Sequence, residues 1–284
     1  MQHLLARARR DADGVRDDMR AYVIEQLGDP GAVLVIDETG DVKKGTATPG
    51  VQRQYTGTAG RTGNAQAAAY PGYAAPRGHP LIDRERSLPR SWAGNEERRA
   101  AAAIPGDVKV AAEPELARPM IERSVTAAVL FAWVAGDEVY GDNGPLRTWL
   151  EAERIAYVLA VAGDHRVPAG AGHALRADQL AARLPRRAWQ PLSAGVGAKG
   201  HRWYDWAWVT VSDPGPGYRY LLIRRNRSTG ELAFYRCYSP RPITLAALVK
   251  VAGLRMRWSR WRRRHQHRAR TCHYQRQITQ NQGT

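Results

Sequence analysis

The spacing of apolar residues predicts a helix and then a buried strand near the start of the chain. Residues 11–27 carry apolar side chains at three- and four-residue intervals, which is typical of an amphipathic helix. Gly28 and Pro30 would end this helix. The run at residues 32–36 has no polar position, as expected of a strand that is buried on both faces, and it leads directly into Asp37.

The following segment is polar and then again strand-like. Glycines and threonines predict a loop over residues 41–64. Extended segments are expected at residues 65–73 and 79–88.

The middle of the chain alternates helices with strands. A helix opens at Pro114, and an apolar strand at residues 131–137 ends in Asp137. A short helix from Pro145 and a strand at residues 157–161 follow. Strands that alternate with helices of this length predict an α/β sheet.

The last third has a different pattern. Residues 163–242 contain strand-like runs that are separated by turns, so we expect a β-rich block there. Thr244 then caps a helix whose apolar face continues to Leu254. Residues 255–284 have no apolar periodicity and are rich in Arg, His and Gln, which predicts a disordered or non-native tail.

Charge and composition narrow the class of protein. The chain has a formal net charge of +16, for which a polyanion is the natural partner, and residues 255–284 hold nine arginines and no acid. The moderate excess of basic over acidic residues in the rest of the chain fits an ordinary solvated surface as well as a nucleic-acid-binding surface. No stretch reaches the roughly 18 apolar residues of a membrane span, and no signal peptide is visible. With only Cys237 and Cys272 present, we expect a cytoplasmic protein and no membrane partner.

Two aspartates carry the candidate chemistry. Asp37 and Asp137 each follow a predicted buried strand, and an open α/β sheet presents ligand-binding groups at such strand ends. One aspartate there most often caps a helix or forms a turn, but two together can hold Mg²⁺ or Mn²⁺ through hard oxygen ligands. Such a site activates water or a hydroxyl group against a phosphodiester. We expect the two carboxyl groups to lie on the order of 4 to 7 Å apart.

Several segments together resemble the DDE transposases of bacterial insertion sequences. The resemblance covers most of residues 10–254, and unrelated segments match in the family's order, which makes the set specific. The matching segments are Val35-Ile36-Asp37-Glu38-Thr39-Gly40, Arg53-Gln54-Tyr55-Thr56-Gly57-Thr58-Ala59-Gly60, Leu81-Ile82-Asp83-Arg84, Leu88-Pro89-Arg90-Ser91-Trp92, Ala135-Gly136-Asp137-Glu138-Val139-Tyr140-Gly141, Tyr157 to Ala162 and Tyr204-Asp205-Trp206-Ala207-Trp208.

This resemblance implies an RNase H-like fold, in which helices flank a mixed α/β sheet and a β-rich insertion (about 163–242) precedes the last helix. Asp37 and Asp137 would be the first two catalytic carboxylates and would hold Mg²⁺ or Mn²⁺. Glu38 and Glu138 would be neighbours that shape the site. The partner would be double-stranded DNA, as transposon ends and target, with a homodimer on DNA as one assembly. The candidate phosphate contacts are Lys43, Lys44, Arg53 and Lys199.

The same resemblance divides the chain into a lead-in helix (1–28), a catalytic domain (29–254) and a basic tail (255–284). In the family, a Trp-Arg-x-Glu-Glu-like segment on the last helix supplies the third carboxylate, whereas no Asp or Glu follows Glu231 here. After Leu254 the sequence changes abruptly to one without acids or apolar periodicity, as an out-of-frame reading of a gene would give. At the other end, the DNA-end-recognition region that such enzymes usually have does not precede the first helix. We therefore expect a transposase remnant, truncated or frameshifted, that binds metal weakly and neither cuts nor joins DNA.

Two other functions remain open at this stage. The chain could be a non-catalytic DNA-binding protein that acts through its charge alone. It could also be a phosphotransferase with Asp37 as nucleophile, although Thr39 stands where such enzymes usually have a second aspartate. Metal binding at Asp37 and Asp137 separates the nuclease from the binding protein, and a covalent aspartyl-phosphate would indicate the phosphotransferase.

Overall fold

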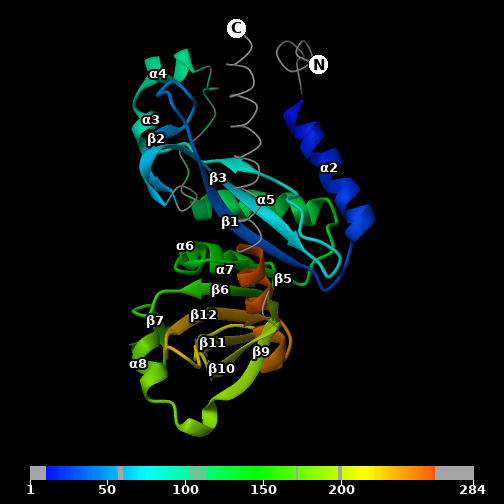
Figure 1. Cartoon of the computed structure of the whole chain (residues 1–284), viewed down its shortest axis with the longest axis vertical. Coiled ribbons are helices and arrows are strands. Elements are labelled where there is room, and N and C mark those ends of the chain that lie inside the picture. The colour runs from blue at the N-terminus through cyan, green and yellow to red at the C-terminus, as the bar shows by residue number, and fades with distance from the viewer. Residues whose placement is uncertain are drawn as a thin grey trace.

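One large mixed β-sheet forms the centre of the described chain (Figure 1). The computed structural model describes residues 11–56, 60–102, 104, 106, 108, 111, 113–170, 172–197 and 200–259. In spatial order the strands are β2 (Val51–Thr56), β3 (Arg61–Ala74), β1 (Val33–Val42), β5 (Trp133–Gly136), β6 (Tyr157–Val161), β12 (Leu232–Ser239), β11 (Tyr218–Arg225), β10 (Gly200–Thr210) and β9 (Gln190–Gly197), and β4 (Glu85–Arg86) pairs with β3.

Strand direction distinguishes the centre of the sheet from its two sides. β1, β5 and β6 are parallel neighbours, whereas β3 pairs antiparallel with β1 and β12 pairs antiparallel with β6. The strands β9 to β12, which come from the β-rich block, continue the same sheet beyond β6. This large mixed sheet flanked by helices confirms the predicted α/β class and is consistent with an RNase H-like fold.

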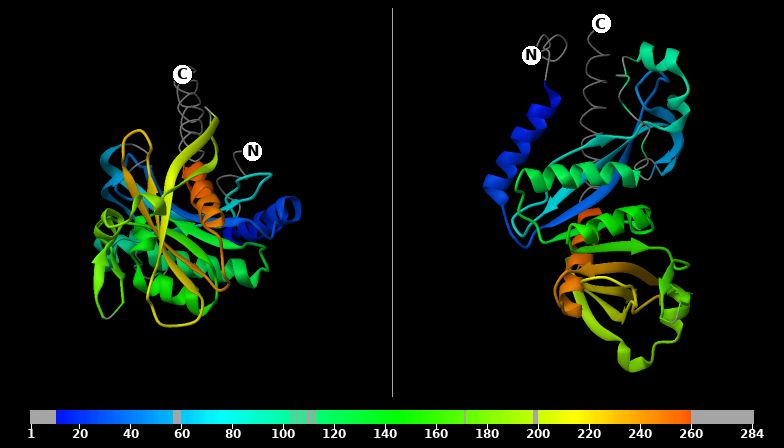
Figure 2. Two further views of the ribbon diagram at one scale, coloured as in Figure 1. Left: turned by 90° about the horizontal axis from the view of Figure 1, so that it is seen from below. Right: turned by 180° about the vertical axis from the view of Figure 1, so that it is seen from behind.

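Helices cover both faces of the sheet. Successive residues of a strand point to opposite faces, so the apolar residues of a buried strand need packing partners on both sides. Val33 and Val35 of β1 pack with the helix at residues 245–259, whereas Leu34 and Ile36 pack with α5, α6 and α7. The left view of Figure 2 shows the orange helix 245–259 above the sheet and green helices below it. The remaining elements are α2 (Ala12–Leu27), α3 (Arg90–Ala93), α4 (Glu96–Ala101), α5 (Glu113–Thr126), α6 (Glu138–Gly141), α7 (Gly144–Ala152), α8 (Ala177–Ala182), η1 (Arg186–Ala188), β7 (Arg166–Pro168) and β8 (Ala174–Arg176).

None of the helices in the described ranges is long and apolar enough to cross a membrane.

Two segments differ from the pattern prediction. Residues 51–56 were expected in a polar loop, but they form β2, because Val51 is buried and its carbonyl accepts a hydrogen bond from the Trp92 indole at 2.8 Å. The expected extended segment at 79–88 contains only the two-residue strand β4. Pro80 has no N–H to donate to β3, and only isolated backbone bonds join the following residues to that strand.

A buried carboxylate fixes α2 and α5 to the sheet. The Asp83 side chain has no exposed surface and lies 3.5 Å from both Arg16 and Arg20 of α2. Arg123 of α5 donates to the same carboxylate at 2.8 Å, and the Arg84 backbone N–H donates at 2.7 Å. Three guanidinium groups thus compensate one desolvated charge, so the pairing holds the two helices in place.

The last helix extends beyond its predicted end at Leu254 and continues through residue 259. Trp258 has no exposed surface and packs on Gly72 of β3, where even a Cβ atom would overlap the indole ring. The assignment of residues 255–259 to the tail is therefore wrong, because burial of Trp258 stabilises a further helical turn that apolar periodicity alone does not reveal. The rest of the predicted tail, residues 260–284, lies outside the described chain.

We expect Trp258→Ala to lower the free energy of unfolding by about 3–5 kcal/mol, since it removes a buried indole from the core. Trp203→Ala is the matched control, because that indole is 52% exposed. The control should change stability by no more than about 0.5 kcal/mol. Urea unfolding followed by circular dichroism measures both, and equal small effects would show that Trp258 is not part of the folded core.

Candidate metal centre

Asp37 lies on the central strand of the sheet. Residues 33–37 of β1 are buried without interruption, and the Asp37 residue is 7% exposed. Because side chains alternate along a strand, Asp37 shares the face of Val33 and Val35. This is the face that helix 245–259 covers.

Asp137 comes to the same place through the parallel pairing of β5 with β1. Val33 pairs with Trp133 and Val35 with Ala135, so the same register, extended by two residues, sets Asp137 level with Asp37. Asp137 also caps α6: its Oδ1 accepts the backbone N–H of Val139 at 3.1 Å. An N-cap bond fixes the orientation of the carboxylate, which is half-buried.

Three carboxylates meet at this point. One oxygen each of Asp37, Glu38 and Asp137 lies within 4.8 Å of the others. Two oxygens on one Mg²⁺ at roughly 2.1 Å are about 3.0 Å apart in cis positions and about 4.2 Å apart in trans positions, so these oxygens would move closer together to share one ion. The donor set, all carboxylate oxygen, fits a hard divalent cation.

Glu38 belongs to this group although the sequence analysis placed it only beside the site. The alternation rule sends the side chains of neighbouring strand residues to opposite faces, so the pattern gave no signal for its participation. Glu138, by contrast, begins α6, is exposed and lies outside the group of three.

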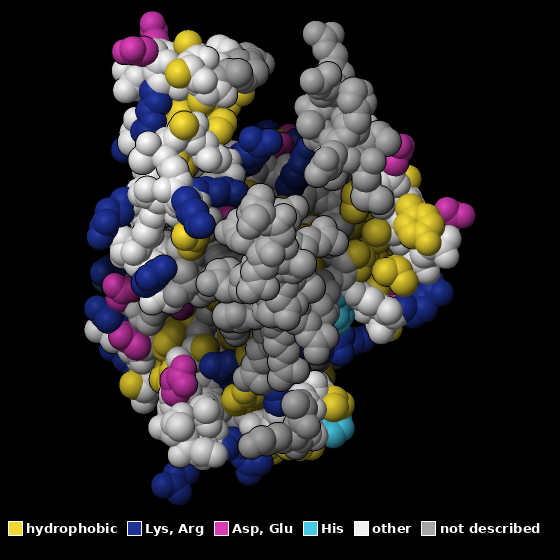
Figure 3. Space-filling view, turned by 45° about the horizontal axis from the view of Figure 1, so that its top comes forward, with side chains coloured by type: hydrophobic (Ala, Val, Ile, Leu, Met, Phe, Trp, Pro, Cys, Tyr) yellow, Lys and Arg dark blue, Asp and Glu magenta, His cyan; other side chains and the backbone are white. Residues whose placement is uncertain are grey.

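The predicted phosphate contacts lie beyond the acids. Lys43 follows the end of β1, and its backbone N–H donates to the carbonyl of Asn64, the residue that pairs with Arg53 of β2. The structure therefore places Lys43 and Arg53 on opposite sides of Asn64 in β3, and the exposed Lys44 follows Lys43. Lys199 lies outside the described residues. On the face drawn in Figure 3, the visible Lys and Arg side chains of the described residues are spread out, with Asp and Glu between them.

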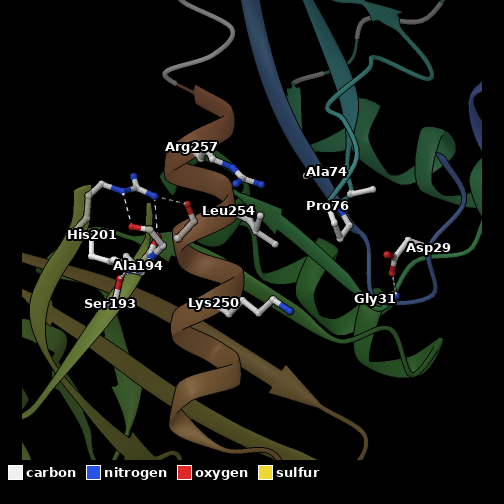
Figure 4. A pocket seen from close by; sticks show the side chains of 14 residues that line it. Asp29, Gly31, Ala74, Pro76, Ser193, Ala194, His201, Lys250, Leu254 and Arg257 are labelled. Atoms are coloured by element: carbon white, nitrogen blue, oxygen red, sulfur yellow. Dashed lines mark hydrogen bonds between the residues drawn. The ribbon is translucent and has the colours of Figure 1, made fainter. Parts of the chain in front are cut away.

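A cleft of about 610 Å³, which the sequence did not indicate, opens at the other end of β1. Figure 4 shows Lys250 and Arg257 extending from helix 245–259 into it, opposite Asp29 and Gly31. The side wall includes Arg202 of β10, whose guanidinium donates to the carbonyls of Ala194 at 2.7 Å and Gly253 at 3.2 Å. Arg202 thus joins β9 to the helix, while Lys250 and Arg257 bring positive charge to the cleft.

A histidine stands at the same edge of the sheet as the acids, in the loop after β6. The Nδ1 atom of His165 lies 2.6 Å from a carboxylate oxygen of Asp142. Burial lowers the pKa of His165 and nearby Arg147 lowers it further, while the bond to Asp142 acts in the opposite direction. His165 thus links the loop after β6 to the end of α6.

We expect Asp137→Asn to stabilise the metal-free protein, because it removes one of three like charges within 4.8 Å while asparagine still caps α6. The gain should be about 1 kcal/mol, or about 2–4 °C in Tm, when thermal unfolding is followed in EDTA. Asp11→Asn, at the N-cap of α2, is the matched control and should show no gain. A lower Tm for Asp137→Asn than for the control would contradict this electrostatic account.

Comparison with known proteins agrees with this geometry. A family model described as the DDE superfamily endonuclease matches residues 1–212. A probable transposase for insertion sequence element IS701 from Microchaete diplosiphon is 27% identical over 170 residues. That alignment covers 59% of the chain but 41% of the relative, so the chain spans less than half of that protein's length. Because the family match includes most of the chain and both aspartates, the chain belongs to the DDE superfamily of endonucleases.

Proposed function

We propose that this chain carries the catalytic centre of a DNA transposase, which cleaves and transfers DNA strands with a divalent metal. The observation that supports this proposal is the meeting of Asp37 and Asp137 just beyond the paired residues of the parallel strands β1 and β5. Family membership supports the same chemistry, since DDE superfamily endonucleases use divalent metals. The similar protein is named as a probable transposase, which supports DNA as the substrate.

The two aspartates would divide the work of the site. Asp37, buried on β1, and Asp137, fixed by its N-cap bond, would hold Mg²⁺ or Mn²⁺ between them. The bound metal would supply activation of the attacking oxygen and stabilisation of the leaving oxygen. Pre-set carboxylates reduce the reorganisation that metal binding requires, because the sheet and α6 already hold both side chains.

We further propose that strand cleavage is impaired in this chain. Helix 245–259 covers the face on which Asp37 lies, yet its described residues contain no Asp or Glu. Catalytic groups that act as a unit lose most of their effect when one is missing. A defective member of the family, with residues 163–242 as its β-rich insertion, fits these observations.

DNA would lie along the direction of β1. Lys43 and Arg53 flank one end of this strand, and Lys250 and Arg257 line the cleft at the other. Six residues separate Asp37 from Lys43, so Lys43 stands about 20 Å from the acids along the strand. The basic side chains would bind DNA phosphates on both sides of the phosphodiester that is cleaved. The proposal places the protein in the cytoplasm, with a homodimer as the acting assembly on DNA.

A non-catalytic, basic DNA-binding protein is the second candidate. The net charge of +16 favours it, because charge alone is sufficient for binding through phosphates. It gives no account of three carboxylates within 4.8 Å of one another, which would repel a phosphate in the absence of a cation.

Ser259→Glu should raise Mn²⁺-dependent nicking of supercoiled plasmid at least about tenfold, because it adds a carboxylate to the helical turn that follows Trp258. Arg255→Glu, one turn earlier on the same helix, is the control and should have little effect. The additional change Asp37→Asn should abolish the gain. Strong nicking by the unmodified chain that disappears on Asp137→Ala would contradict the proposed impairment.

Removing charge from either end of β1 should weaken DNA binding. For each of the pairs Lys43→Gln with Arg53→Gln, and Lys250→Gln with Arg257→Gln, the slope of log K against log salt should fall by roughly 1.8, or about 0.9 per lost phosphate contact. Fluorescence anisotropy with a short duplex over a KCl series measures these slopes.

The control for charge alone replaces two exposed arginines at α8 and η1, Arg183→Gln with Arg187→Gln. Its slope should change little. An equal fall for all three pairs would contradict a path along β1 and indicate that the duplex binds without a fixed orientation.

A further inference from the structure

The unusual feature of the acid group is that it takes two neighbouring residues from one strand. Asp37 pairs with Tyr70 and Glu38 with Ala69, so both are regular members of the β1–β3 ladder. Their backbones therefore direct the two side chains to opposite faces. The carboxylate oxygens of both nevertheless lie within 4.8 Å of each other and of Asp137.

The position of this group along β1 explains how two neighbouring side chains can approach the same point. The strand is buried through Asp37 and becomes half-buried from Glu38 onward. β5 ends at Gly136, so beyond Asp137 the chain leaves the sheet to form α6. Glu38 thus stands where β1 has no further pairing with β5, and its longer side chain reaches the carboxylates at this edge.

The helix that covers this face brings no acid of its own. Trp258 packs on Gly72, which pairs with Val35, two residues before Asp37. The helix therefore approaches β1 close to the acids with an indole ring, and its described residues include no carboxylate. A site with two aspartates alone would offer a divalent cation few charged ligands, and cation affinity rises with the number of charged ligands.

We infer that Glu38 is the third carboxylate ligand of the cation site that Asp37 and Asp137 form. This inference rests on the proposed function and changes one part of it. Metal binding is retained in this chain through a ligand from β1, while a ligand from the last helix is missing. The site then holds a cation through three carboxylates from two adjacent segments. Cleavage is impaired because the third carboxylate lies on β1 and not on the last helix.

The experiment measures Mn²⁺ binding to the full chain by calorimetry and by the electron paramagnetic resonance signal of free Mn²⁺. Glu38→Gln should weaken binding at least about tenfold, because it removes one charged ligand without changing size. Glu138→Gln is the matched control, since Glu138 is also a glutamate directly after a site aspartate but lies outside the group. It should leave affinity within about twofold.

Glu38→Asp separates ligation from charge. It keeps the charge but shortens the side chain by one methylene, so its affinity should fall between those of the unmodified chain and Glu38→Gln. Affinity equal to the unmodified chain would show that only charge matters and would overturn the inference. Circular dichroism of each variant establishes that it is folded before binding is measured.

Asp37→Asn distinguishes this inference from the proposed function. If Asp37→Asn loses Mn²⁺ binding while Glu38→Gln keeps it, Glu38 is not a ligand and the proposed function stands. If neither change alters binding, both the inference and the metal-dependent function are wrong. Loss of binding in both, with Glu138→Gln unaffected, is the result that we expect.

Discussion

The parallel pairing of β1 with β5 is the constraint on which the candidate centre depends. It matches Val33, Leu34 and Val35 of β1 with the residues one hundred positions later, so two aspartates far apart in sequence reach the same level of the sheet. A slip of two residues would preserve the buried face of each strand but would move the carboxylates about 6.6 Å apart along the strand. Burial of the apolar residues selects the face of the sheet on which each aspartate lies, and the backbone hydrogen bonds between β1 and β5 set its position along the strand.

Some of this arrangement could be predicted from sequence and some could not. Uninterrupted apolar runs before Asp37 and Asp137 identify buried strands, and parallel buried strands present their carboxyl ends at one edge. Glu38 was not found as a group member because a period of two assigns it to the other face, whereas the length of its side chain and the end of β5 decide its position. The last turn of helix 245–259 was missed because a single tryptophan seated on a glycine stabilises it, and no periodicity reports such a contact.

Two buried acids show how differently a sheet can accommodate negative charge. Asp83 forms ion pairs with Arg16 and Arg20 of α2 and with Arg123 of α5, which link both helices to this carboxylate. Asp37 is grouped with two further carboxylates, and like charges at such a distance repel one another. The first arrangement holds the scaffold together, and the second uses the rigidity of that scaffold to keep like charges close.

The order of the strands has a consequence for how the chain is made. β6 is synthesised long before its neighbour β12, and the helix that covers the face of Val33, Val35 and Asp37 comes last of all the described elements. On a ribosome, one apolar side of the half-built sheet therefore stays open to water while some eighty further residues emerge, for about 4–16 seconds at bacterial rates of 5–20 residues per second. Trp258 is the last buried hydrophobic residue of the described chain to be made, so this part of the core is completed only after that interval.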